Sequence, residues 1–191
     1  MQFQHHYLKA PNIMNVTNEQ DFDYANQIRK LIKLGATPKD LIILLPSFFS
    51  ESLTETAANA KAVRTYDQLK LKGTIKPSKR PVYFPTLAKT SKNHKIITNF
   101  GLQILVATSN TSYEEDLNEI FVDVYESYIN NNPKTILNLQ EAYAIFKYVI
   151  NHKNNNYFKL VKKCPTCTSH YIFISHFSGR EVCPYCKKPP L

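Results

Sequence analysis

Residues 164–186 read CPTCTSHYIFISHFSGREVCPYC and contain all four cysteines of the 191-residue chain. The spacing C-x2-C-x15-C-x2-C is typical of a zinc site. Two residues between paired cysteines form a tight turn, a knuckle, from which both thiolates can reach one ion, and the fifteen-residue insert is long enough for a β-hairpin. We therefore predict a β-hairpin between the two knuckles and one structural Zn2+ per chain, held by Cys164, Cys167, Cys183 and Cys186.

Four thiolates around one ion leave no open position for water or substrate, so this site is expected to stabilise the fold. So small a segment buries little apolar surface, and metal binding would supply much of its folding free energy. Two disulfides would require an oxidising compartment, which nothing in the sequence indicates. An iron–sulfur cluster is a further alternative, as is ligation by His170 or His176.

The chain before the cysteines has the apolar periodicity of helices. Thr37, Pro38 and Asp40 predict a helix start, with threonine as the N-cap. Capping boxes are predicted at 52–55 and 112–115, and Asn132-Pro133 predicts another start. The predicted helices span 21–34, 38–45, 52–71, about 93–109, and two segments that begin at 112 and at 132.

The remaining segments complete the predicted architecture. Three prolines in 73–95 favour an extended, basic linker, and 157–161 and 171–174 resemble short strands. The expected fold is mainly α, with a helical domain followed by a small C-terminal β-hairpin zinc ribbon. The predicted boundaries are an irregular arm over 1–20, the helical domain over 21–153 and the four-cysteine zinc-binding module over 154–191.

The formal net charge of +9 is concentrated in two blocks. Residues 60–95 carry ten basic side chains against the single carboxylate of Asp67, and residues 153–191 carry seven against Glu181. Such blocks favour a polyanionic partner, either nucleic acid or an acidic membrane. No signal peptide and no membrane-spanning stretch is evident, so a cytoplasmic bacterial protein without a membrane partner is expected.

The predicted helices at 38–45 and 52–71, joined by a turn, fit a helix-turn-helix within 37–72. A helical hairpin with a solvated basic face fits the same pattern. Arg64 is the best candidate for reading a guanine, whereas lysines more often hold phosphates. The predicted DNA-binding residues are Lys61, Arg64, Lys70, Lys72, Lys76, Lys79, Arg80, Lys162, Lys163, Arg180, Lys187 and Lys188.

No catalytic constellation is visible. The four glycines are isolated, so there is no glycine-rich phosphate loop, and the carboxylates are scattered over helix faces. We therefore expect a binding protein rather than an enzyme. A zinc protein that binds RNA or the ribosome would share the basic charge and is the main alternative.

The order of motifs resembles the FlhC family, the zinc-containing subunit of the flagellar master regulator of enterobacteria. The resemblance covers roughly residues 21–190 and is carried by IRKLIKLGA (28–36), YFP (83–85), FKYVI (146–150) and the two knuckles followed by KKPP (187–190). It implies a DNA-binding transcription activator that forms a hetero-oligomer with the helical partner FlhD and recruits RNA polymerase. Relatives on conjugative elements activate transfer genes instead of flagellar ones. The segment 47–58 looks about a dozen residues longer than in the flagellar protein.

Overall fold

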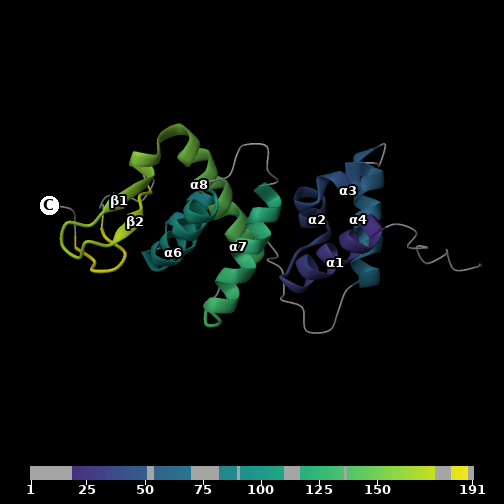
Figure 1. The fold of residues 1–191 in the computed structure, drawn as a ribbon, viewed down its shortest axis with the longest axis horizontal. Helices are drawn as coiled ribbons and strands as arrows, with labels where there is room; N and C mark the ends of the chain where they lie inside the picture. Colours follow the sequence, from purple (N-terminus) through teal and green to yellow (C-terminus); the bar gives the residue numbers. More distant parts are fainter. Residues whose placement is uncertain are drawn as a thin grey trace, which may run out of the picture.

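The computed structural model describes residues 19–50, 54–69, 82–89, 91–109, 117–135, 137–174 and 182–188. These ranges form a mainly helical fold that ends in a small antiparallel sheet (Figure 1), which confirms the predicted fold class. The elements are α1 (Glu19–Lys33), α2 (Pro38–Leu44), α3 (Pro46–Ser50), α4 (Glu55–Leu69), α5 (Phe84–Ala88), α6 (Ser91–Ala107), α7 (Leu117–Asn131), α8 (Leu139–Leu160), β1 (Val161–Lys163) and β2 (His170–Ile172).

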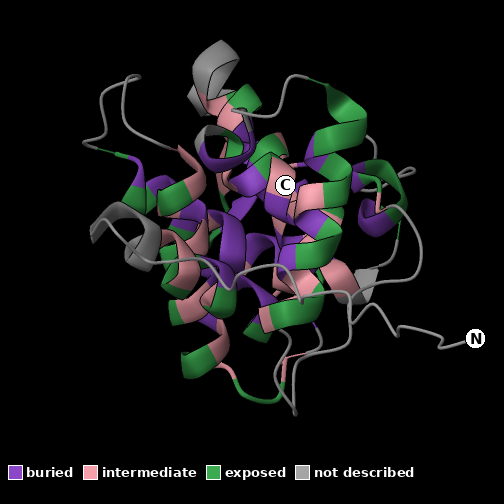
Figure 2. Cartoon of the chain, turned by 90° about the vertical axis from the view of Figure 1, so that its right-hand side faces the viewer, coloured by how far each residue is buried: buried purple, intermediate pink, exposed green. Residues whose placement is uncertain are grey.

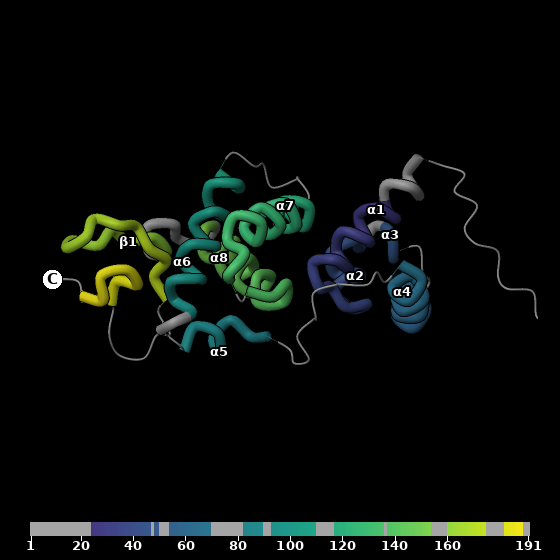
Figure 3. Tube along the Cα trace, turned by 90° about the horizontal axis from the view of Figure 1, so that it is seen from below, coloured from purple at the N-terminus to yellow at the C-terminus, as the bar shows by residue number. Residues whose placement is uncertain are grey.

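The elements are arranged along one long axis. Helices α1 to α4 lie at one end, the sheet lies at the other, and α6 to α8 lie between them (Figure 1). The view from below shows the same order, with α5 alongside α6 (Figure 3). One apolar core extends from α1 to β2, and its buried residues line the inner faces of the helices (Figure 2). No described helix is both long enough and apolar enough to span a bilayer.

The start of α2 is as predicted. The Thr37 hydroxyl accepts a hydrogen bond from the backbone N–H of Asp40, whose carboxylate accepts one from the N–H of Thr37. This reciprocal pair satisfies two N–H groups that the first turn of a helix leaves unpaired. Gly35 ends the preceding turn with a φ of 93°, a backbone conformation that glycine adopts without steric penalty.

The predicted turn between α2 and the basic helix is wrong. Helix α2 stops before Pro46 as predicted, but Pro46 also begins the short helix α3, because a first helical position needs no N–H. Helix α4 begins at Glu55, and its cap is the Thr54 hydroxyl, which accepts from the N–H of Ala57 at 3.2 Å. The predicted start at residue 52 lies outside the described residues.

Two other predicted boundaries are corrected. Helix α8 does not begin at Asn132-Pro133, because the Asn132 amide bonds the Tyr128 carbonyl at the end of α7. Instead, Asn138 caps α8 through reciprocal hydrogen bonds with Glu141. The predicted linker 73–95 contains α5 and the first turn of α6 from Phe84 onward. Proline at the second position of α5 is compatible with a helix start.

The strands also differ from the prediction. Residues 157–160, predicted as a strand, continue α8 across the expected domain boundary at 154. Strand β1 follows directly and pairs with β2, with Val161 opposite Ile172 and Lys163 opposite His170. The hairpin therefore encloses the first knuckle instead of lying between the two knuckles.

Candidate metal centre

The first knuckle is the turn of the β1–β2 hairpin. The backbone N–H of Thr168 donates to the Cys164 carbonyl, and the N–H of Cys164 donates to the Ser169 carbonyl, both at 2.9 Å. Thr168 has a φ of 60°, which reverses the chain after the second cysteine of the pair. These bonds close a compact loop that presents Cys164 and Cys167 on one side.

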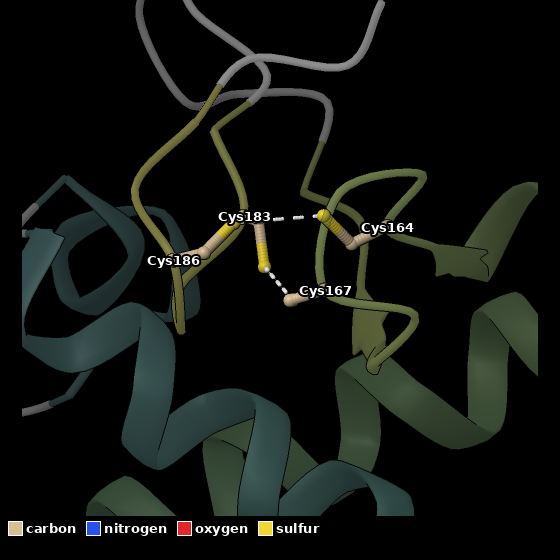
Figure 4. A group of neighbouring side chains, drawn as sticks. All are labelled: Cys164, Cys167, Cys183 and Cys186. Carbon is tan, nitrogen blue, oxygen red and sulfur yellow. Dashed lines mark hydrogen bonds between the residues drawn. The ribbon is translucent and has the colours of Figure 1, made fainter.

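The second knuckle repeats this backbone. The N–H of Lys187 donates to the Cys183 carbonyl at 3.0 Å, and the N–H of Cys183 donates to the Lys188 carbonyl at 3.1 Å. Lys187 has a φ of 62° and stands four residues after Cys183, as Thr168 does after Cys164. Two loops of the same construction thus face one another (Figure 4).

The four cysteine sulfurs meet between the knuckles and could hold a metal ion. All four Sγ atoms lie within 4.8 Å of one another, and Cys164–Cys186 and Cys167–Cys183 are each 3.6 Å apart. Zinc–sulfur bonds of about 2.3 Å in a tetrahedron place sulfurs about 3.8 Å apart, so the spacing fits one ion. A disulfide needs about 2.05 Å, and all four cysteines are free.

Hydrogen bonds in the first knuckle lower the pKa values of both of its cysteines. The side chain and the backbone N–H of Ser169 lower the pKa of Cys167 to about 6. The N–H groups of Cys167 and Thr166 lower the pKa of Cys164 in the same way. The thiolate is the metal ligand, so lowered pKa values favour the binding form.

Cys186 shows the effect of crowding four sulfurs. The N–H of Lys188 lowers its pKa, but burial and the three neighbouring cysteine side chains together raise it to about 11. Like charges at this spacing disfavour further ionisation. A divalent cation among them would offset that repulsion, so this donor set suits a bound metal ion.

The hairpin docks on α6 through both backbone groups of one residue. The N–H of Ile172 donates to the Thr98 hydroxyl at 3.3 Å, and His94 Nε2 donates to the Ile172 carbonyl at 2.9 Å. A Cβ on Gly101 would lie 3.0 Å from Ile172 Cγ1, so glycine permits this close approach. In the second knuckle, the Tyr185 hydroxyl donates to Asn99 Oδ1 at 2.7 Å.

These α6 residues were missing from the sequence prediction. Ile97, Phe100 and Ile104 form the core face of α6, and all three side chains are buried. His94, Thr98 and Gly101 recur at helical spacing on the face that meets β2. Polar and small residues at that spacing were the available signal, although they did not identify the partner.

The predicted DNA-binding residues of α4 differ in their surroundings. Lys61 Nζ donates to the Phe48 carbonyl at 2.7 Å and lies 4.0 Å from the centroid of the Phe48 ring, so it contributes to the packing of α3 on α4. Arg64 is exposed. It lines an open groove on α4 with Ala57, Ala60, Lys61, Thr65 and Gln68.

The other described residues of the predicted DNA-binding set lie at the opposite end of the molecule from α4 (Figures 1 and 3). Lys162 lies with Nζ 3.7 Å from the centroid of the Phe173 ring, and Lys163, Lys187 and Lys188 are exposed around the knuckles. The described members of the predicted DNA-binding set thus lie on two separate surfaces instead of one. Lys70, Lys72, Lys76, Lys79, Arg80 and Arg180 lie outside the described residues.

Comparisons with known proteins found no relative of this chain. No family model, no curated protein and no solved structure matches it. The likeness to the FlhC family therefore rests on the order of the quoted motifs alone.

Proposed function

We propose that the four cysteines hold one structural zinc ion and that the chain is a DNA-binding subunit of a transcription activator of the FlhC type. The metal centre carries the proposal, because four sulfurs within 4.8 Å leave room for a single ion and no open coordination position. An all-thiolate tetrahedron suits zinc, which has no redox chemistry and no geometric preference of its own. The bound ion would hold the two knuckles together and would not take part in a reaction.

The charge of the chain supports DNA as the partner. The net charge of +9 favours a polyanion. Among the predicted DNA-binding residues, Arg64 is exposed on α4, and Lys163, Lys187 and Lys188 are exposed around the knuckles. Arg64 is exposed on α4, where its guanidinium has the two-pronged geometry that reads guanine. The FlhC resemblance adds an FlhD-like helical partner and RNA polymerase, with flagellar or transfer genes as targets.

Metal analysis tests the first half of the proposal. Protein purified under reducing conditions should contain one zinc per chain, measured by elemental analysis, and no stoichiometric iron. Stoichiometric iron together with a visible absorption band would show that the site holds an iron centre and not zinc. The absence of any transition metal would remove the basis of the proposal.

Fluorescence anisotropy with labelled duplex DNA and a structured RNA tests the second half. Duplex binding should weaken steeply with salt because phosphate contacts release counterions. Arg64→Ala should reduce discrimination between DNA sequences, whereas Lys79→Ala should weaken binding to all sequences equally. Equal effects of the two substitutions would mean that α4 is not the reading helix, and preference for the RNA would favour the ribosome-associated alternative.

Co-expression tests the partner. The product of the neighbouring open reading frame should be a short all-helical protein that co-purifies with this chain through size exclusion. A chain that remains alone under these conditions would argue against an FlhD-like hetero-oligomer.

A further inference from the structure

The two knuckles share a backbone but differ in the side chains that follow the cysteines. The first carries Thr168 and Ser169, and the second carries Lys187 and Lys188 at the equivalent positions. Because the first knuckle closes with hydroxyl residues, the turn itself does not require lysines. The two lysines of the second knuckle therefore call for another explanation.

A third lysine, Lys95 on helix α6, lies beside the second knuckle. The Tyr185 hydroxyl bonds Asn99, and Lys95 Nζ lies 6.0 Å from the centroid of the Tyr185 ring. Lys187 is also close to this helix, because its charge adds to burial in lowering the pKa of His94. Two lysines that are more than ninety residues apart in the sequence, Lys95 and Lys187, thus both lie near the contact between Tyr185 and α6.

These three lysines are available to a ligand. Lys95, Lys187 and Lys188 are exposed, and in the part of the chain that the structure describes none of them forms a salt bridge. The backbone on which Lys187 and Lys188 stand is held by its hydrogen bonds to Cys183, and Lys95 stands on a helix. Cations on a rigid backbone avoid the entropic cost of ordering a loop on binding.

We infer that the junction of α6 and the second knuckle is an anion site in which Lys95, Lys187 and Lys188 bind phosphate groups. The DNA part of this inference rests on the proposed function: the ligand is the phosphodiester backbone of duplex DNA. Lysine binds phosphate as a point charge and carries no sequence information. This site therefore positions the duplex and does not read it.

Charge-neutral variants test the site. Lys95→Gln and Lys187→Gln should each weaken duplex binding equally for all sequences and reduce the slope of log K against log salt by about 0.9, the value for one lost phosphate contact. The matched control is Lys147→Gln on α8, because Lys147 is exposed and also lies over a tyrosine ring, 4.9 Å from the centroid of Tyr143. The control should leave the slope unchanged.

Two checks separate the possible failures. Every variant must retain one metal ion and the melting temperature of the parent, so that lost binding is not lost folding. Unchanged slopes in both test variants, or an equal loss in the control, would overturn the anion site while the proposed function stands.

A chain that binds no duplex DNA would instead overturn the proposed function. NMR titration with inorganic pyrophosphate then tests the site alone. Amide shifts confined to residues around Lys95, Tyr185 and Lys187, and absent in Lys95→Gln, would support the anion site. Shifts spread over the surface, or none, would overturn it.

Discussion

The first and second knuckles are built alike and attached differently. Each knuckle closes with the same pair of backbone hydrogen bonds and has a residue of left-handed backbone conformation at the same position, Thr168 in the first and Lys187 in the second. The first knuckle is the turn of a hairpin that continues from α8. In that hairpin, both the N–H and the carbonyl of Ile172 are hydrogen-bonded to side chains of α6. The second knuckle follows residues 175–181, which lie outside the described residues, and it contacts α6 through Tyr185.

The comparison shows that the backbone of the knuckles determines the candidate metal centre, whereas their side chains determine the surface around it. The backbone sets the positions of the sulfurs, so each knuckle contributes two of the four sulfurs of the candidate site. The Lys187 and Lys188 side chains are not needed for this backbone, because the first knuckle closes with Thr168 and Ser169 instead, so the two lysines are free to serve another role. Substitutions at the two left-handed positions, Thr168 and Lys187, should therefore have equal effects on metal binding and unequal effects on DNA binding.

The largest effect is expected from removing one thiolate. Cys167→Ser and Cys183→Ser should each reduce bound metal well below one per chain and melt the sheet region, because an apparent binding free energy of about 10–16 kcal/mol supports such modules. Elemental analysis and thermal melting measure the two effects. Thr166→Ser, a change beside Cys167 that leaves all four sulfurs in place, should retain the metal. Loss of metal from only one of the two cysteine variants would show that the knuckles are not equivalent.

The sequence predicted the sulfur cluster because its determinants are local. Two CxxC pairs form two turns whatever surrounds them, and all four Sγ atoms converge as the spacing indicated. The hairpin was misplaced because pairing is not local. A strand can pair on either side of a turn, and β1 precedes Cys164 instead of following Cys167.

The same limit explains the errors in the helices. The sequence predicted a domain boundary at residue 154, yet α8 continues to Leu160, which is only 2% exposed and therefore held by the core. Lys95 was assigned to a linker because of nearby prolines. Its proximity to Tyr185 is a tertiary contact that no local pattern carries.

A smaller effect is expected where the hairpin meets α6. Gly101→Ala would place a Cβ 3.0 Å from Ile172 Cγ1 and 3.2 Å from Val149 Cγ2, and both of those side chains are fully buried. Overpacking costs about 1–3 kcal/mol, and helix propensity returns up to about 1 kcal/mol. A net loss of about 1 kcal/mol in the free energy of unfolding is expected by urea titration. The exposed control Gln103→Ala should change it by less than about 0.5 kcal/mol.

Hydrogen exchange sharpens this result. Gly101→Ala should speed exchange of the Ile172 amide more than that of the Tyr185 amide, because Ile172 of the hairpin is the nearest neighbour of the added Cβ. Equal acceleration at both positions would mean that the two knuckles open together and that the hairpin is not a separate support.

The contact between His94 and the hairpin should also make the stability of the protein depend on pH. Burial, with a contribution from the Lys187 charge, lowers the pKa of His94, although the hydrogen bond to Ile172 opposes the shift. The unfolded chain then binds the proton first, so the free energy of unfolding should fall as pH drops below about 6.5. His94→Gln retains a donor for the Ile172 carbonyl but does not titrate, so its stability should fall less between about pH 8 and about pH 6. Urea titrations with zinc in excess measure both proteins, and parallel curves would contradict this assignment.

The smallest effect on stability is expected at the two left-handed residues, and it provides the sharpest comparison of the knuckles. A side chain in this conformation costs about 1–2 kcal/mol, and glycine relieves it at an entropic cost of about 0.5–1 kcal/mol. Thr168→Gly and Lys187→Gly should therefore each raise the free energy of unfolding by about 0.5 kcal/mol. Duplex DNA binding should weaken only in Lys187→Gly, because Thr168 carries no charge to lose. Equal affinities in the two variants would show that the second knuckle, like the first, serves the metal alone.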